Sequence, residues 1–110
     1  MKRGEIRWYK FTRPDKKRPV VILTRNSIIE FLEEVTVAPI TSIVRSIPSE
    51  VFLGTNDGMP KNCVINLDHI QTVSKSKMGS LVTTLNSEKM SELRSAILFA
   101  LGFKIDYKSL

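Results

Sequence analysis

Short apolar runs rich in β-branched residues recur through the first two-thirds of the chain, and they restrict its possible folds more than any other feature. Runs of this length are typical of β-strands, and turn-forming residues such as Asn56-Asp57-Gly58 separate them. Val20–Leu23 has no polar position, which predicts a strand buried on both faces. We expect strands at 5–11, 20–23, 35–40, 51–53, 64–67, 70–73 and 80–83. This pattern predicts an antiparallel, mostly β domain.

The last third of the chain carries a helical pattern instead. Asn86 or Ser87 is suited to cap a helix, and Glu88 would interact favourably with the helix dipole there. Gly102 is a natural end for the helix. Apolar residues recur between these points at helical spacing, namely Met90, Leu93, Ile97, Ala100 and Leu101. We expect one helix of about 15 residues, or roughly 22 Å, which covers an open side of a small barrel.

Three segments have less regular patterns. Residues 25–34 fit either a helical turn or a mobile loop, and the sequence leaves both open. Thr12–Lys17 is a short, very basic connection with Pro14-Asp15 as its turn signal. Pro39 cannot donate a hydrogen bond to a sheet, so we expect its strand to be an edge strand or to be bulged there. Bulges often lie beside active sites because they redirect side chains.

The chain has 110 residues, 17 of them basic and 11 acidic, which gives a formal net charge of +6. Its length fits one domain, spanning 1–110. The positive charge favours a polyanionic partner, although it also serves solubility alone. No apolar stretch approaches the roughly 20 residues of a membrane helix, and Met1–Glu5 has no apolar segment of a signal peptide behind it. We therefore expect no membrane association and a cytoplasmic location.

A single cysteine and a single histidine restrict the chemistry. Cys63 cannot form an internal disulfide, and its apolar neighbours are typical of a buried structural thiol. His69 offers too few partners for a metal cluster, so we expect no metal and no other cofactor. A structural or loop position is the ordinary role for such a histidine.

Arg18 and Thr41 occupy matching points of two expected strands. Arg18-Pro19 opens the apolar run at 20–23, and Thr41 follows Ala38-Pro39-Ile40. A sheet or a small barrel would bring them together although they are 23 positions apart. A guanidinium group offers a rigid fork to two phosphate oxygens, and a hydroxyl can donate to a third or relay a proton. In a basic chain, this pair indicates phosphate chemistry on a nucleic acid.

Five segments, taken in order, resemble the MazF/PemK family of toxin endoribonucleases from bacterial toxin–antitoxin modules. They are Lys2–Ile6, Arg18–Leu23 with Asn26, Ala38–Ser42, Gly58–Val64 and Leu67–Val73. The resemblance implies an SH3-like barrel with a C-terminal helix, assembled as a homodimer. It also implies metal-independent cleavage of single-stranded RNA such as mRNA. A cognate antitoxin with an acidic C-terminal segment would occupy the RNA groove.

By motif position, the resemblance implies that Arg18 and Thr41 are catalytic. The 2′-hydroxyl of the substrate would be the nucleophile, which leaves a 2′,3′-cyclic phosphate and a 5′-hydroxyl. A single histidine excludes a two-histidine mechanism, and neither an arginine nor a free threonine is a good base. Positioning and electrostatics should therefore carry most of the rate, and the proton-transfer roles stay open.

Further residues are candidate RNA contacts, with an ordinary solvated side chain as the alternative for each. The candidates are Lys16, Lys17, Arg25, Ser42, Lys61 and Lys75. Arg45 and Lys77 also fall in expected loops. Trp8 fits stacking on a base or, more commonly, a core or interface position. Two departures from the family concern RNA sequence preference: a short connection without glycine before Arg18, and Arg7 where the family often has an aromatic residue.

Two other functions are compatible with this type of fold. A gyrase poison of the CcdB type would resemble that family in a C-terminal Trp-Gly-Ile ending. This chain instead ends in Phe103–Leu110, and Trp8 lies near the opposite end. A non-catalytic SH3-like module would bind nucleic acid without cutting it.

Overall fold

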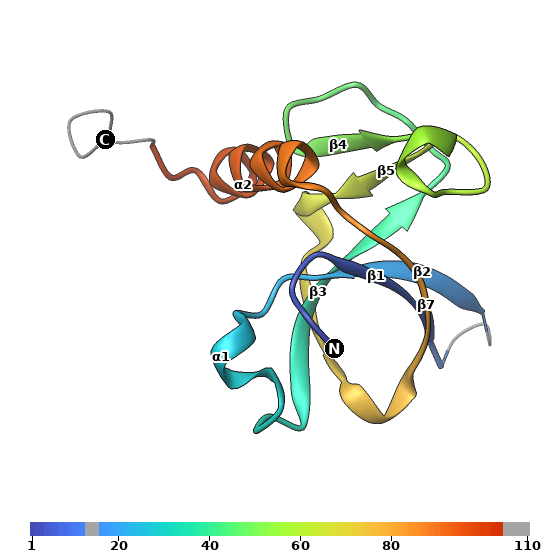
Figure 1. Cartoon of the computed structure of the whole chain (residues 1–110). Helices are drawn as coiled ribbons and strands as arrows, with labels where there is room; N and C mark the ends of the chain where they lie inside the picture. Colours follow the sequence, from blue (N-terminus) through green and yellow to red (C-terminus); the bar gives the residue numbers. More distant parts are fainter. Residues whose placement is uncertain (13–15, 105–110) are drawn as a thin grey trace.

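The protein is described by a computed structural model that covers residues 1–12 and 16–104, so the expected turn at Pro14-Asp15 lies outside the described residues. The chain forms a curled, half-barrel β-sheet with a C-terminal helix on one side (Figure 1), which confirms the mostly β prediction. The elements are β1 (Glu5–Lys10), β2 (Lys17–Ile22), α1 (Asn26–Ile29), β3 (Glu34–Thr41), β4 (Glu50–Leu53), η1 (Thr55–Asp57), β5 (Cys63–Asn66), η2 (Leu67–His69), β6 (Gln71–Ser74), η3 (Lys75–Lys77), β7 (Met78–Thr84) and α2 (Ser87–Leu101).

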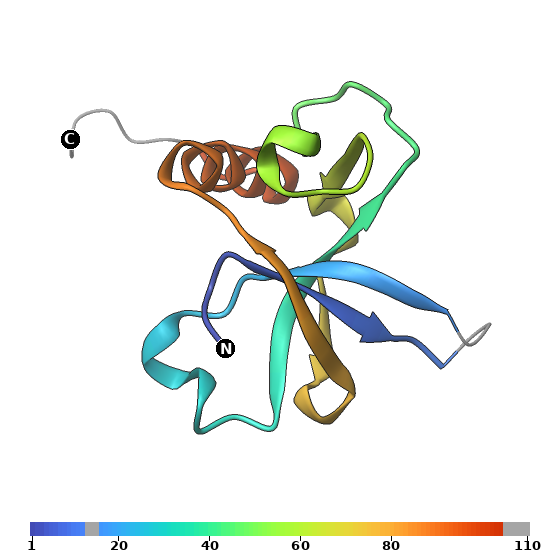
Figure 2. The same cartoon turned by 45° about the vertical axis from the view of Figure 1, so that its right-hand side comes forward.

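Strand β3 joins the two halves of the sheet. The strand order is β4-β5-β3-β2-β1-β7, with β6 pairing β3, and all recorded pairs are antiparallel. The first half of β3 pairs with β6 at 34–37, and its end pairs with β5 at Ile40 and Thr41. Figures 1 and 2 show β3 running from the lower half of the molecule to the upper half, which carries β4, β5 and α2. The space between the halves is therefore bordered by the ends of several strands.

Pro39 lies where β3 exchanges one partner for the other. The sequence predicted an edge strand or a bulge at Pro39. β3 is not an edge strand, because it pairs on both sides, and its register with β2 runs through Pro39 without a shift. The Leu23 N–H donates to the Thr36 carbonyl, and hydrogen-bonded pairs alternate along an antiparallel ladder. The pair Val20–Pro39 is consequently not hydrogen-bonded, and the Pro39 nitrogen faces the interruption between β6 and β5. A proline is tolerated there because no ladder bond is lost.

The sheet buries one hydrophobic cluster on each face. One cluster lies under α2 and includes Ile6 and Val21, and the other includes Val20 and Ile22. Val20, Val21 and Ile22 are fully buried, which confirms that this strand is covered on both faces. Residues 25–34 contain the short helix α1, whose Ile29 is buried in the second cluster.

Helix α2 has the predicted ends. The Asn86 side chain accepts a hydrogen bond from the Lys89 N–H at 2.8 Å, and Gly102 ends the helix with a φ of +76°. Leu93 is buried as expected, together with Ala96, but Leu101 is 57% exposed. Leu101 lies about 80° around the helix from Leu93, so its inclusion in the buried stripe was wrong. None of the helices in the described residues is long and apolar enough to cross a membrane.

Candidate active site

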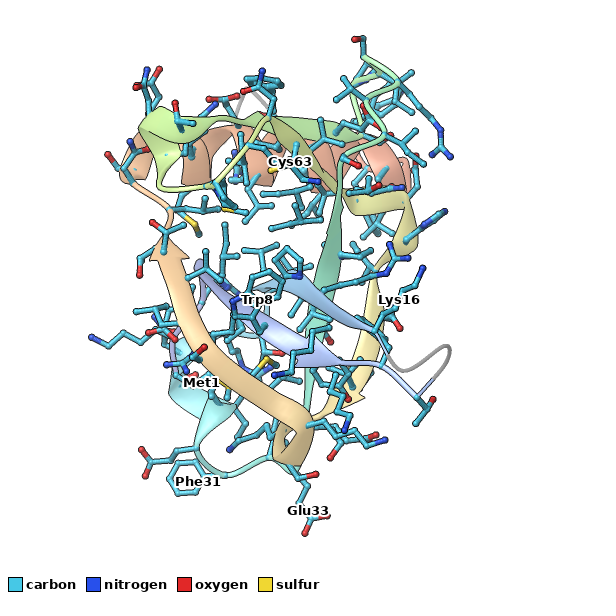
Figure 3. All side chains as sticks on the ribbon, turned by 90° about the vertical axis from the view of Figure 1, so that its right-hand side faces the viewer. Met1, Trp8, Lys16, Phe31, Glu33 and Cys63 are labelled. Carbon is cyan, nitrogen blue, oxygen red and sulfur yellow. The ribbon has the colours of Figure 1, made fainter. Side chains whose placement is uncertain are left out.

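A cavity of about 260 Å³ lies between the two halves of the sheet. Its walls come from β1, the start of β2, the end of β3, the segment before β5, and β7. Trp8 lies on the lower half, and Cys63 on the upper half (Figure 3). The lining residues are Trp8, Lys17, Arg18, Pro19, Ile40, Thr41, Ser42, Met59, Pro60, Lys61, Cys63 and Val82.

Arg18 and Thr41 both line this cavity. The last recorded pair between β2 and β3 is Val20–Pro39. Arg18 and Thr41 each lie two residues beyond this pair on their strands, at the cavity. Arg18 is exposed, and within 1–12 and 16–104 its guanidinium group has no recorded hydrogen bond or ion pair. It is therefore available to an anion that enters the cavity.

The Thr41 hydroxyl is oriented by a local hydrogen bond. Its oxygen accepts from the Ile43 N–H at 3.2 Å, and Thr41 is held from the other side by pairing with Val64 on β5. A hydroxyl has one proton to donate as well as its lone pairs. Because the recorded bond uses the oxygen as acceptor, the proton remains available to a phosphate oxygen. The geometry favours Thr41 as a donor over Thr41 as a base.

Three of the other predicted residues also line the cavity. They are Lys17, Ser42 and Lys61, each of them exposed. Lys16 is exposed directly before β2 but does not line the cavity. Two ammonium groups and a guanidinium group, with two hydroxyls, thus surround one space. Such a set of groups suits a phosphodiester.

Two predicted residues lie elsewhere. Arg25 lines a separate hollow with Arg3 and Phe31. The Lys75 ammonium group donates to the Ile29 carbonyl at 2.7 Å, which ties η3 to α1. Their positions were not foreseeable from spacing, because the contact between η3 and α1 is a tertiary feature.

Cys63 is buried, as predicted. Burial raises the pKa of its thiol, and the nearby Asp57 charge raises it further. A neutral thiol is a poor nucleophile. His69 lies outside the cavity in η2, with its Nδ1 3.4 Å from the Asn66 Nδ2 atom. In the part of the chain that the structure describes, no three His, Cys, Asp or Glu side chains are grouped so that they could hold a metal ion.

Trp8 also lines the cavity, although the sequence favoured a core or interface position over base stacking for it. It is only partly buried, and its partner in the β1–β2 register is Pro19, next to Arg18. The signal that points to it is this register, which depends on strand pairing. Met59 and Pro60 add apolar surface to the lining.

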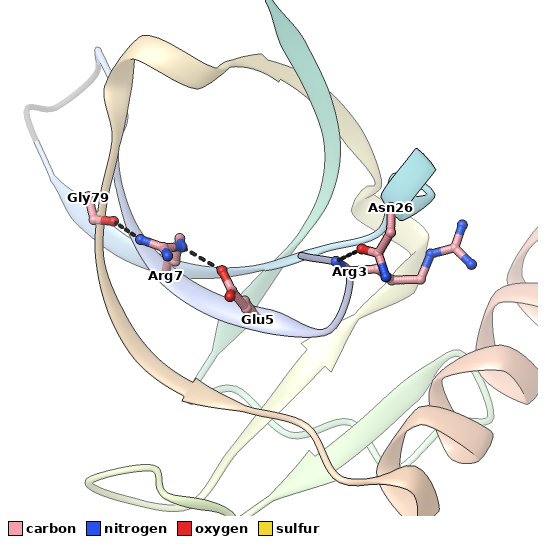
Figure 4. Close-up of polar contacts among 5 residues, drawn as sticks. All are labelled: Arg3, Glu5, Arg7, Asn26 and Gly79. Carbon is pink, nitrogen blue, oxygen red and sulfur yellow. Dashed lines mark hydrogen bonds and ion pairs between the residues drawn. The ribbon is translucent and has the colours of Figure 1, made fainter. Parts of the chain in front are cut away.

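Arg7 joins β1 to β7 near this cavity (Figure 4). Its Nε donates to the Glu5 Oε1 at 2.8 Å, and its Nη1 donates to the Gly79 carbonyl at 3.0 Å. Burial works to raise the pKa of Glu5, but the hydrogen bond and positive charge of Arg7 contribute to a net lowering. Figure 4 also shows the Arg3 N–H donating to the Asn26 side chain, at 2.7 Å, which fixes the N-terminus against α1.

A wider hollow of about 780 Å³ lies beside α2. Its lining includes Glu50 and Glu92, with Lys104 as a basic residue and Phe99 and Phe103 as apolar residues. Two carboxylates disfavour a polyanion. We therefore place the candidate active site in the smaller, basic cavity.

Comparison with known proteins identifies relatives of this chain. A family model described as PemK-like, MazF-like toxin of type II toxin–antitoxin system matches residues 2–101. The chain is 37% identical over 83 residues to endoribonuclease MazF3 of Mycobacterium tuberculosis, covering 76% of this chain and 81% of that protein. It is 32% identical over 93 residues to probable endoribonuclease MazF2 of the same species, covering 84% and 89%.

Solved structures also include proteins with a fold similar to that of this chain. Mycobacterium tuberculosis toxin MazF-mt6 is 33% identical with a TM-score of 0.84, covering 92% of this chain and 99% of that chain. An endoribonuclease in complex with its cognate antitoxin from Mycobacterial species has a TM-score of 0.85 at 24% identity, covering 96% and 99%. At 24% identity, the similarity to the second structure shows the fold alone.

Proposed function

This chain belongs to the PemK/MazF family of endoribonuclease toxins from type II toxin–antitoxin systems, and we propose that it cleaves single-stranded mRNA sequence-specifically without a metal ion. The observation that carries the proposal is the basic cavity that contains both Arg18 and Thr41. These two residues are the proposed catalytic pair. We propose that they act within a single domain that spans 1–110.

The proposed reaction is a transesterification within the RNA. The 2′-oxygen bonds to the adjacent phosphorus while the bond from phosphorus to the 5′-oxygen breaks. The 2′-hydroxyl loses its proton, and the leaving 5′-oxygen gains one. The products are a 2′,3′-cyclic phosphate and a 5′-hydroxyl.

The residues of this cavity can stabilise the charge that develops during this reaction. The Arg18 fork can donate to two phosphoryl oxygens, and the Thr41 hydroxyl can donate to one. Neither group is suited to remove the 2′-proton, because Arg18 is a very weak base and the Thr41 oxygen already accepts from Ile43. We therefore assign the rate enhancement to positioning and electrostatics. Neither of the two proton transfers is assigned to a named residue.

Contacts to the rest of the RNA follow from the lining. We propose that Lys17, Ser42 and Lys61 contact the RNA in the cavity, with Lys16 at its margin. Arg25 and Lys75 lie outside the cavity. They would contact only RNA that extends well beyond the cleaved phosphate.

We also propose a cognate antitoxin, a homodimer and a cytoplasmic location. A structural relative is an endoribonuclease in complex with its cognate antitoxin, and the basic cavity suits an acidic segment. The exposed Phe99 and Leu101 side chains on α2 give a second copy an apolar surface to cover. The cytoplasm is where mRNA would be encountered.

Cleavage of a mixed-sequence RNA in EDTA tests the reaction. We expect defined cuts whose downstream fragments accept a 5′-label from polynucleotide kinase without phosphatase treatment. Arg18→Ala should slow the cuts by about 10²–10³-fold, whereas Lys2→Ala, which removes an exposed charge away from the cavity, should not. RNA that stays intact across diverse sequences would overturn the proposal.

The identity of the nucleophile is tested separately. Once a cut site is mapped, the same RNA is made with a 2′-deoxynucleotide on the 5′ side of the cleaved bond. We expect this RNA to bind but not to be cut. Cleavage at the unchanged position would show that water or a protein group attacks the phosphorus.

A further inference from the structure

Strand β7 carries a bulge opposite Trp8. The recorded β1–β7 pairs on either side are Arg7–Leu81 and Tyr9–Met78, so Trp8 alone faces both Gly79 and Ser80. Bulges of this kind interrupt pairing and redirect side chains. A Cβ atom on Gly79 would lie 3.2 Å from the Trp8 carbonyl oxygen and 3.5 Å from its Cβ. Glycine therefore allows β7 to approach Trp8 closely.

Arg7 fixes the bulge in place. It donates to the Gly79 carbonyl at 3.0 Å, and Glu5 holds the same guanidinium group at 2.8 Å (Figure 4). The two side chains are only 23% and 13% exposed. A partly buried ion pair that binds a bulge carbonyl gives the wall beside Trp8 a defined shape.

The bulge borders a second, smaller cavity of about 90 Å³. Its lining residues are Trp8, Tyr9, Lys10, Lys17, Lys77, Gly79 and Ser80. It shares Trp8 and Lys17 with the candidate active site, so these two residues lie between the cavities. A water molecule occupies about 30 Å³ of liquid volume, and a space of three waters suits a phosphate group better than a nucleobase.

Three lysine side chains line this cavity, and they give it a positive character that suits an anion. Lys10 and Lys17 are directly opposite each other in the β1–β2 register, and Lys77 lines the same space. Within the described ranges, 1–12 and 16–104, neither Lys17 nor Lys77 has a recorded ion pair. A bound phosphate could pair with both of these ammonium groups.

We propose that this small cavity is a subsite for a phosphate adjacent to the cleaved one, bound by Lys17 and Lys77, with the attached base stacked on Trp8. The inference rests on the proposed function and adds a second binding position to the same substrate. An RNA strand is the occupant that fits, because an aromatic face beside cations is the usual surface for unpaired nucleotides. The shared wall of Trp8 and Lys17 provides the continuity between the two positions.

The test measures affinity for RNA that cannot be cleaved. Mixed-sequence 2′-O-methyl RNAs of increasing length are titrated into the full chain by fluorescence anisotropy at several salt concentrations. Lys77→Ala should lower affinity several-fold and reduce the slope of log affinity against log salt by about 0.7, but only for RNAs that reach both cavities. Lys2→Ala removes the same charge at an exposed position that lines neither cavity and is the matched control.

Trp8 gives a second measurement. Trp8→Ala should weaken binding about tenfold, and Trp8→Phe should retain most of the affinity because a ring remains. If Lys77→Ala and Lys2→Ala have the same effect at every RNA length, the subsite does not exist. If wild-type protein fails to cut RNA while Lys77→Ala still loses length-dependent affinity, the proposed function fails and the subsite stands.

Discussion

The two ends of β2 differ sharply although they belong to one six-residue strand. Val20–Ile22 is completely buried between two hydrophobic clusters, whereas Lys17 and Arg18 are exposed at the candidate active site. β1 pairs with residues 17–21 of the strand, including its exposed end, but β3 pairs only with the buried end. The difference arises because β3 moves away to β5 after Pro39. One strand can therefore supply stability at one end and chemistry at the other.

The largest expected effect separates stability from activity. Ile22→Ala removes a fully buried side chain and should lower the free energy of unfolding by about 2–5 kcal/mol, since it leaves a cavity. Urea denaturation followed by circular dichroism measures this. The activity of the folded fraction should be retained at low temperature. A loss below about 1 kcal/mol would mean that the buried end of β2 matters less than its burial indicates.

Arg18→Ala should produce the reverse result. We expect RNA cleavage to slow by about 10²–10³-fold, which corresponds to about 2.7–4 kcal/mol of transition-state stabilisation. The free energy of unfolding should change by no more than about 0.5 kcal/mol, because Arg18 is exposed. Single-turnover kinetics and denaturation measure the two quantities. Arg18→Lys should recover only part of the rate, since an ammonium group has no planar fork. Equal losses of stability and activity would contradict the division of β2.

Thr41 sharpens the comparison at the end of β3. Thr41→Val keeps the branched shape but removes the hydroxyl, so we expect cleavage to slow about tenfold or more and the acceptor for the Ile43 N–H to be lost. Thr41→Ser keeps the hydroxyl and should retain most of the rate. Cleavage rates for the three proteins at saturating RNA measure this. A Val variant as fast as the Ser variant would remove Thr41 from the mechanism.

The smallest expected effect is on the pH dependence of stability and concerns the Arg7–Glu5 ion pair, in which Arg7 joins β1 to β7. The pKa of Glu5 is lowered in the folded protein, so the ionised form contributes stability above its ordinary value of 4.5, and this contribution is lost as the pH falls through the lowered pKa. Arg7→Gln should therefore reduce stability at pH 7 and make the loss of stability below pH 4.5 shallower. Thermal unfolding between pH 3 and 7 measures this. Unchanged acid sensitivity would show that Arg7 does not control Glu5.

Local patterns predicted most of the secondary structure. The helix ends at Asn86 and Gly102 follow from capping and a left-handed glycine, which depend on neighbouring residues. The double burial of Val20–Ile22 follows from a run without polar residues. The sheet position of the strand that contains Pro39 was harder to predict, because the position of a strand within a sheet depends on its partners. The same proline is compatible with an edge strand or with an exchange of partners.

The residues of the candidate site that follow from motif order could be predicted from the sequence. Those whose position depends on strand register could not. Arg18, Thr41, Lys17, Ser42 and Lys61 line one cavity in the structure. The structure placed Arg25 and Lys75 elsewhere, near α1, because the chain between β2 and β3 folds back against the second cluster. Trp8 required the β1–β2 register to be recognised as a cavity wall.

The amino-acid sequence by itself determined which segments become strands or helix, the positive charge and the motif order that indicates the family. These properties depend on side-chain polarity, local backbone preference and residue order. Only the tertiary structure decided that Lys17, Trp8 and Lys77 surround one space and that Arg7 holds the Gly79 bulge. Strand pairing brings together residues far apart in the chain, and a shift of one position would turn every side chain to the opposite face.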